Sequence, residues 1–147
     1  MGFLSSIDVS ASALTAEKLR MDIISKNIAN ANTTRTASGS PYRRQMVVFE
    51  GAESNIPFSQ YLNVASKALI GNGVKVKGIV EDMSPYKSVY EPGHPDADEN
   101  GYVKMPNVDV MTEMVNMITA SRSYEANVTA INSSKGMAMK ALEIGRG

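Results

Sequence analysis

Two stretches decide the fold of this chain: SSIDVSASALTAEKLRMDIISKNIANA at residues 5–31 and VDVMTEMVNMITASRSYEANVTAINSSKGMAMKALE at residues 108–143. Apolar side chains recur every seven residues along each stretch. The recurring residues are Ile7, Leu14, Met21 and Ile28 in the first stretch, and Val110, Met117, Tyr124, Ile131 and Ala138 in the second. This spacing keeps one side of a helix turned towards a partner helix. We therefore expect two long helices that pack against each other as an antiparallel, coiled-coil-like pair.

Both expected helices also carry apolar residues on a second side. In the first helix, Leu19 and Ile23 fall nearly opposite the seven-residue series. In the second helix, Met111, Val115 and Ile118 lie well away from the series that begins at Val110. One partner helix can cover only one side. We therefore expect the second sides to pack against helices of neighbouring subunits.

The interior of the chain predicts a small β unit. Residues 35–42 are polar and rich in turn-forming residues, and residues 91–107 are rich in proline, so we expect a loop and an extended linker there. The expected strands are Gln45–Phe49, Val74–Val80, which follows a tight turn at Gly71–Gly73, and Lys87–Tyr90. The second helix should begin after Pro106, with Asn107 or Asp109 as its N-cap and Glu113 in its first turn.

The expected fold class is mainly α with a small β insert. Its three parts are an N-terminal assembly helix at 1–34, a central segment of strands and loops at 35–107, and a C-terminal assembly helix at 108–147.

Composition excludes several classes of protein. Lys and Arg together number 15, as do Asp and Glu, so the formal net charge is zero and nucleic-acid binding is not expected. There is no cysteine, which excludes disulfides, zinc–thiolate sites and a cysteine nucleophile. No apolar run approaches the ~20 residues of a membrane span. The N-terminus lacks the basic and apolar regions of a cleaved signal peptide.

One loop suggests a metal site. Asp96-Ala-Asp98-Glu-Asn100-Gly101 matches the first six positions of an EF-hand loop. Asn107 then stands where a bidentate Glu belongs, and nearby prolines exclude an entering helix. We expect no metal, but a small Ca²⁺-binding module at Asp96–Asn100, or a helix-binding module that uses the Met-rich second helix, remains the alternative function.

The sequence does not favour an enzyme. His94 is the only histidine and has no partner nucleophile nearby in the sequence, and no phosphate-binding or nucleophile motif is present. We expect neither catalysis nor a cofactor.

Several motifs occur in an order that resembles bacterial flagellar rod and hook proteins. Asn27–Thr33 closes the first helix, with Arg35 and Pro41–Arg44 following, and Glu113–Ile118 leads to Ser121–Asn127 in the second helix. Three further motifs are similar to those of proximal rod proteins: His94–Asp98, Gly101–Val103 and Pro106–Asp109. The resemblance covers essentially the whole chain.

This resemblance implies a structural subunit that assembles helically into the drive shaft of the flagellum, across the periplasm. Its terminal helices would form the inner tube of the rod. The implied partners are copies of itself, other rod proteins, membrane-ring or rod-adaptor proteins at the proximal end, and the flagellar type III apparatus that exports it unprocessed.

We expect the assembly interface to consist mainly of apolar residues of both helices, with three asparagines at the end of the first helix fixing the subunit's register. The predicted residues are Ile7, Leu14, Leu19, Met21, Ile23, Asn27, Ile28, Asn30, Asn32, Met111, Met114, Val115, Met117, Ile118, Tyr124, Val128 and Ile131.

Overall fold

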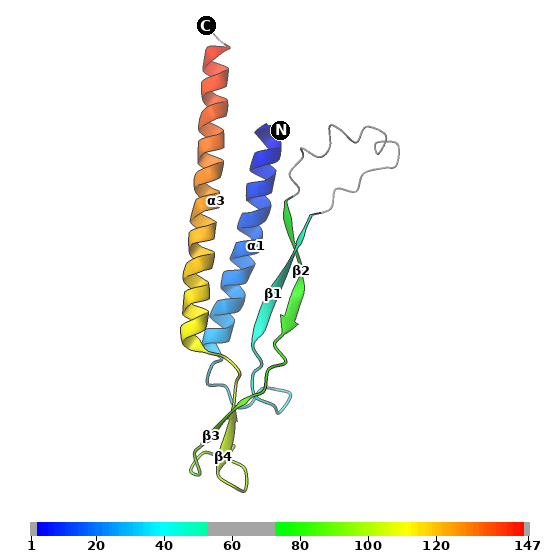
Figure 1. Cartoon of the computed structure of the whole chain (residues 1–147), viewed down its shortest axis with the longest axis vertical. Coiled ribbons are helices and arrows are strands. Elements are labelled where there is room, and N and C mark those ends of the chain that lie inside the picture. The colour runs from blue at the N-terminus through cyan, green and yellow to red at the C-terminus, as the bar shows by residue number, and fades with distance from the viewer. Residues whose placement is uncertain (1–2, 53–72, 146–147) are drawn as a thin grey trace, which may run out of the picture. The chain divides into compact units, whose positions relative to one another are not determined.

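The structure is a computed structural model that describes residues 3–52 and 73–145. In chain order its elements are α1 (Phe3–Ala29), β1 (Gln45–Gly51), β2 (Val74–Glu81), β3 (Lys87–Tyr90), β4 (Tyr102–Met105) and α3 (Val110–Ile144) (Figure 1). The prediction of two long terminal helices with a small β insert is confirmed. Within the described ranges, neither helix combines the length and apolar character that a membrane crossing requires.

The chain divides into two compact units, and each unit combines segments that are distant in the sequence. Unit 1 takes in the described parts of Met1–Lys18, Phe49–Lys77 and Ser121–Gly147, and unit 2 consists of Leu19–Val48 and Gly78–Ala120. Both helices therefore contribute residues to both units. The division into parts at residues 34 and 107 stays a prediction.

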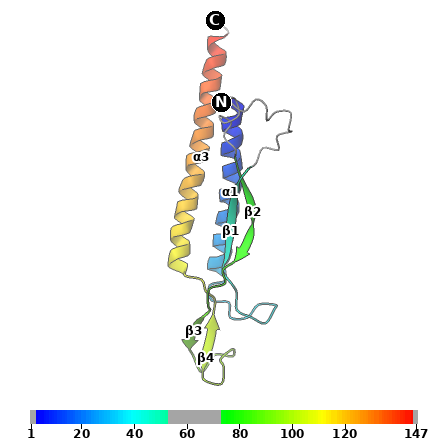
Figure 2. The ribbon, with the colours of Figure 1, turned by 45° about the vertical axis from the view of Figure 1, so that its right-hand side comes forward.

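In unit 2, the last turns of α1 lie beside the first turns of α3 and run in the opposite direction (Figures 1 and 2). Neither stretch contains Gly or Pro, so nothing interrupts the helical hydrogen bonds. Ile23 and Ile24 of α1 are 7% and 5% exposed, and Ala120 of α3 is fully buried. The predicted pairing of the helices is thus confirmed, and these residues supply its core.

The seven-residue series of α1 is not its most buried side. Ile7, Leu14, Met21 and Ile28 are only half-buried, whereas Ala16, Ile23, Ile24 and Asn27 are buried. Ile23, expected on the second side, therefore lies in the core. The α3 series is likewise half-buried from Met117 onwards, and Val110 is exposed. The buried side of α1 thus differs from the side marked by the seven-residue series. Spacing did not predict this difference because only apolar residues were counted, and the buried side includes the polar Asn27.

β1 and β2 form a two-stranded sheet. Both strands were predicted, and the structure extends them to Gly51 and Glu81. Alternation in β2 leaves Lys75 and Lys77 exposed, each within 4 Å of a carboxylate oxygen of Glu50. Of the predicted turn before β2, Gly71 and Asn72 lie outside the described residues.

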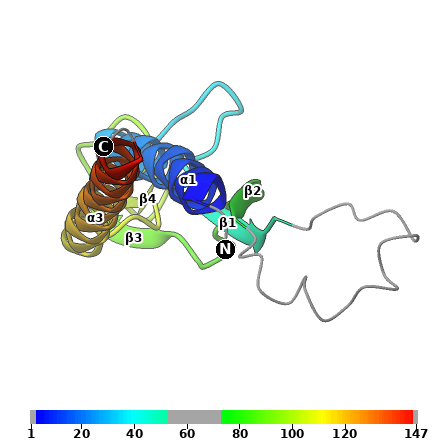
Figure 3. The ribbon, with the colours of Figure 1, turned by 90° about the horizontal axis from the view of Figure 1, so that it is seen from above.

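A second two-stranded sheet, β3 and β4, corrects the prediction of a linker at 91–107 (Figures 2 and 3). The strands are antiparallel, with Val89 opposite Val103 and Tyr90 opposite Tyr102. Val103 is fully buried, which gives the short strand a core of its own. Proline content suggested an extended linker, but the alternating residues Tyr102–Met105 follow a compact turn that returns the chain to β3.

Asp98 and Gly101 form the turn that leads into β4. The Asp98 carboxylate accepts hydrogen bonds from the backbone amides of Asn100 and Tyr102, both at 2.9 Å. Gly101 has φ of +78°, in the region that glycine alone adopts without strain. The chain can therefore reverse and pair Glu91 with Gly101 through a 2.9 Å backbone hydrogen bond.

Candidate assembly site

An apolar surface on α3, here called the α3 face, is the first part of the candidate site. Met111, Met114, Val115 and Ile118 are 71%, 51%, 62% and 54% exposed. Their spacing places them on one side of the helix, and all four belong to unit 2. A contiguous apolar surface on a water-soluble helix usually marks a contact with another molecule.

The second part is a group of buried and half-buried polar side chains, here called the polar cluster: Asn27, Tyr42, Arg44, Asp82, Asn107 and Glu113. Asn27 lies at its centre and is 1% exposed. Its Nδ2 donates to the backbone oxygen of Gln45 and to Glu113 Oε2, both at 2.8 Å. Its Oδ1 accepts from Tyr42 Oη at 2.9 Å and from the Gln45 amide at 3.0 Å. All four hydrogen-bonding positions of this side chain are therefore used inside the chain.

Glu113 is the charged member of the polar cluster on α3. It is 1% exposed, and its Oε1 accepts hydrogen bonds from Arg44 Nη2 at 2.8 Å and Nε at 3.0 Å. A buried carboxylate needs a cation and further hydrogen bonds, because desolvation of an unpaired charge costs several kcal/mol. Arg44 provides that cation, and Asn27 satisfies the other carboxylate oxygen.

Arg44 also reaches the segment that follows β2. Its Nη1 lies 3.3 Å from Asp82 Oδ2. Burial alone would lower the pKa of Arg44, but hydrogen bonds and charge from Glu113, and then from Asp82, raise it above its ordinary value. Hydrogen bonds from Ser84, and to a smaller extent from Arg44, hold the pKa of Asp82 below its ordinary value. The guanidinium thus stays charged while it joins two acidic side chains.

Backbone contacts complete the polar cluster. Asn107 Oδ1 accepts from the Arg44 amide at 2.9 Å, and its Nδ2 donates to the backbone oxygen of Asp82 at 2.9 Å. Burial, followed by the charges of Glu113 and Glu81, raises the pKa of the Tyr42 hydroxyl. The hydroxyl therefore remains a hydrogen-bond donor to Asn27 at neutral pH.

The N-terminus of α3 places Glu113 in position. Asp109 Oδ2 accepts from Thr112 Oγ1 at 2.6 Å, and its backbone oxygen accepts from the Glu113 amide at 2.9 Å. Asp109 is therefore the N-cap, one of the two predicted candidates, and Asn107 belongs to the polar cluster instead. Glu113 lies in the first turn of α3, as predicted, and its side chain faces the core.

The other predicted interface residues divide by exposure. Asn32 is exposed. Ten others are half-buried: Ile7, Leu14, Leu19, Met21, Ile28, Asn30, Met117, Tyr124, Val128 and Ile131. Asn30 bonds within its own chain, through Nδ2 to the Lys26 oxygen and through Oδ1 to Thr33. The α3 face brings together four predicted residues, whereas Ile23 and Asn27 are buried within the chain. Their role between subunits stays a prediction.

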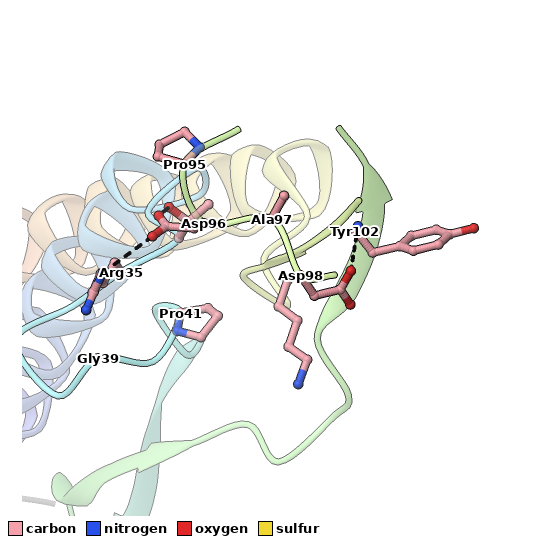
Figure 4. Close-up of a pocket in the computed structure, with 10 residues that line it drawn as sticks. Arg35, Gly39, Pro41, Pro95, Asp96, Ala97, Asp98 and Tyr102 are labelled. Atoms are coloured by element: carbon pink, nitrogen blue, oxygen red, sulfur yellow. Dashed lines mark hydrogen bonds and ion pairs between the residues drawn. The ribbon is translucent and has the colours of Figure 1, made fainter. Parts of the chain in front are cut away.

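The loop considered for calcium lines an open pocket of about 370 Å³ (Figure 4). Its two aspartates are engaged: Asp96 accepts from Thr34 Oγ1 at 2.8 Å and faces Arg35 at 3.7 Å, while Asp98 holds the turn before β4. Among residues 3–52 and 73–145, no three His, Asp or Glu side chains converge as metal ligands.

Sequence reasoning missed most of the polar cluster. Arg44 was named only as the end of the Pro41–Arg44 motif, and Asp82 was not singled out. One signal was present: Glu113 falls on the same helical stripe as Met117 and Ala120. A carboxylate on a buried stripe demands a basic partner. Sequence alone did not show that Arg44, 69 residues earlier, is that partner.

Comparisons with known proteins agree with the resemblance. The family described as "Flagella basal body rod protein" matches residues 7–35, and the family described as "Flagellar basal body rod FlgEFG protein C-terminal" matches residues 99–144. These two matches cover most of α1 and all of α3, including Asn27 and Glu113.

Three relatives carry the same name, "Flagellar basal-body rod protein FlgC". The protein of Bacillus subtilis (strain 168) is 51% identical over 96% of this chain and 97% of its own length. That of Borreliella burgdorferi is 50% identical over the full length of both chains, and that of Salmonella typhimurium (strain LT2) is 44% identical over 99% of this chain and the whole of its own. Their names describe structural rod proteins and no enzymatic activity. The chain belongs to the FlgC family of flagellar basal-body rod proteins.

Proposed function

We propose that this rod subunit assembles through the terminal helices, with the α3 face packed against a helix of a neighbouring subunit. The observation that carries the proposal is the exposure of four apolar side chains on one side of α3. Full burial of a Met, Val or Ile side chain is worth roughly 1.5–3 kcal/mol. Covering four side chains that are more than half exposed would therefore stabilise each contact by several kcal/mol.

The proposed contact joins two different surfaces, the α3 face of one subunit and a helix side of the next. Such head-to-tail contacts do not close on themselves as a two-fold dimer does, and they generate rings or helical tubes. A helical tube is the form that a rod requires. Torque would pass through many packed side chains at once, so no single residue would transmit it.

The family supports association with other components of the flagellar basal body. We propose in particular that copies of the chain contact one another, other rod proteins, and membrane-ring or rod-adaptor proteins at the proximal end of the rod. We also propose a periplasmic location reached by export through the flagellar type III apparatus. Asn32, which is exposed at the end of α1, is the best placed of the three asparagines to contact a neighbour.

The test is a matched pair of substitutions at adjacent positions of α3. Ile118→Asp places a charge in the α3 face, and Thr119→Asp places the same charge one residue further along, at an exposed position outside that face. Each variant is expressed in bacteria that lack their own copy of the gene. Basal bodies are then purified and imaged by electron microscopy, and swimming is measured in soft agar.

We expect Ile118→Asp to abolish rods and swimming, and Thr119→Asp to retain both. Circular dichroism of the two isolated chains should show the same helix content, because both positions face solvent in the subunit. Normal rods in the Ile118→Asp strain would refute the α3 face as an assembly surface. Ile28→Asp, on the half-buried side of α1, tests the other terminal helix in the same way.

A further inference from the structure

We infer that the polar cluster sets the register in which the two terminal helices pair, and so positions the α3 face for assembly. The link to assembly rests on the proposed function, whereas the link to helix register concerns the isolated chain. The inference names Arg44 and Glu113 as positioning residues, although neither belongs to the exposed surface that would contact a neighbour.

Geometry is the first argument. The Asn27–Glu113 hydrogen bond, at 2.8 Å, directly joins the last turns of α1 to the first turn of α3. It is directional and buried, so a shift of one helix along the other by a turn would leave both groups desolvated and unpaired. The apolar neighbours Ile23, Ile24 and Ala120 impose no comparable penalty, since methyl groups pack in several registers.

Connectivity is the second argument. Arg44 holds Glu113 by two hydrogen bonds to one carboxylate oxygen, and it also pairs with Asp82. Asn27 holds the Gln45 backbone through both its amide and its oxygen. Both ends of the cross-helix bond are thus tied to the segment that enters β1. The register of the helices therefore depends on this segment as well as on the two helices themselves.

Proximity to the assembly surface is the third argument. Glu113 precedes Met114 and Val115 directly and lies within the same turns as Met111 and Ile118. Its side chain points into the core while theirs are exposed. Fixing the position of Glu113 sets the rotation of α3 about its own axis and its position along α1. It therefore sets the direction in which the α3 face points.

Buried ion pairs are a weak source of stability, and in some proteins buried polar groups instead specify one arrangement of the helices. This distinction supplies the test. Arg44→Met leaves Glu113 buried without its cation. Arg44→Met with Glu113→Leu replaces the pair by apolar side chains and leaves Asn27 three of its four hydrogen bonds. Lys26→Met is the matched control, because it removes a basic side chain whose contact with Gln45 is exposed.

Helix register is measured by pulsed electron spin resonance on the full-length isolated chain. The chain has no cysteine, so nitroxides attach only at the introduced Ser25→Cys and Thr119→Cys, two exposed positions of α1 and α3 in unit 2. Stability is measured on the same samples by hydrogen exchange of the unit 2 helix amides.

We expect one narrow distribution of the distance between the two nitroxides in the chain that carries only the labelling substitutions, and the same in Lys26→Met. Arg44→Met should broaden this distribution and speed amide exchange on the order of a thousandfold, because it leaves a buried charge unpaired. The double variant should regain slow exchange but keep the broad distribution. If the double variant also regains the narrow distribution, the polar cluster contributes only stability and the inference is wrong. The inference would also be overturned by a broad distance distribution in the chain that carries only the two labelling substitutions, because its polar cluster is intact.

Assembly separates this inference from the proposed function. The double variant, tested in basal bodies beside Ile118→Asp, should form rods poorly although its α3 face is intact. Rods that are absent in the double variant but present in Ile118→Asp would refute the proposed function and leave the register result standing. Normal rods in a double variant with a broad distance distribution would refute the claim that the polar cluster positions the α3 face.

Discussion

Val103→Ala should selectively loosen the sheet formed by β3 and β4. Val103 is fully buried, whereas Val89, its partner across the sheet, is 38% exposed. The substitution removes two methyl groups, worth about 1.6 kcal/mol at about 0.8 kcal/mol each, and a small cavity adds to this, for a total of roughly 2 kcal/mol. The matched substitution Val89→Ala should cost about 1 kcal/mol or less, because that side chain already contacts water.

Native-state hydrogen exchange measures both costs at the same site. The Glu91 amide donates to the Gly101 oxygen at 2.9 Å and is exposed to exchange when the two strands separate. A loss of 2 kcal/mol should speed its exchange roughly 30-fold in Val103→Ala, against about fivefold or less in Val89→Ala. Equal acceleration in the two variants would refute the view that Val103 is the core of this sheet.

Two further substitutions test the local geometry. Gly101→Ala should destabilise the sheet of β3 and β4 by about 1–2 kcal/mol, because φ is positive at this position and an added Cβ would lie 2.9 Å from the Tyr90 ring. Gly93→Ala is the control. An added Cβ at Gly93 meets open space, so this substitution should not change the exchange of the Glu91 amide. The hydrogen bond from the Thr112 hydroxyl is the main cause that holds the pKa of Asp109 in the folded chain below its ordinary value of 3.8. The contribution of Asp109 to stability is therefore fully present above pH 3.8, and it is lost as the pH falls through the pKa of the folded state. In urea unfolding series between pH 2 and 6, Asp109→Asn should keep the cap and flatten this dependence; an unchanged slope would contradict the assignment.

The helices, and three of the four strands within residues 3–52 and 73–145, could be predicted because their signals are local. Apolar periodicity marks α1 and α3, and strict alternation marks β2. The position of Ile23 could not be predicted, since heptad spacing shows which residues share a side but not which side becomes the core. β4 was missed because its four residues follow a proline-rich turn, and only pairing with β3 makes them a strand.

The candidate site shows the same division between local and distant information. The α3 face follows from the spacing of Met111, Val115 and Ile118 along one helix. The polar cluster depends on contacts between Asn27, Arg44 and Glu113, which lie far apart in the sequence. A single sequence gives no direct indication of which of its 15 basic residues will pair with one buried carboxylate.

The 86-residue separation of Asn27 and Glu113 has a consequence for when the chain can fold. Contacts between distant residues form slowly, because the intervening chain must first be brought together. On a ribosome that adds about 5–20 residues per second, α1 waits roughly 4–17 s after Asn27 is made before its partner exists. Until then, Asn27 can bond only to nearer residues such as Tyr42 and Gln45. The contact between α1 and α3 therefore forms later than the contacts of Asn27 with Tyr42 and Gln45, which are only 15 and 18 residues away in the sequence.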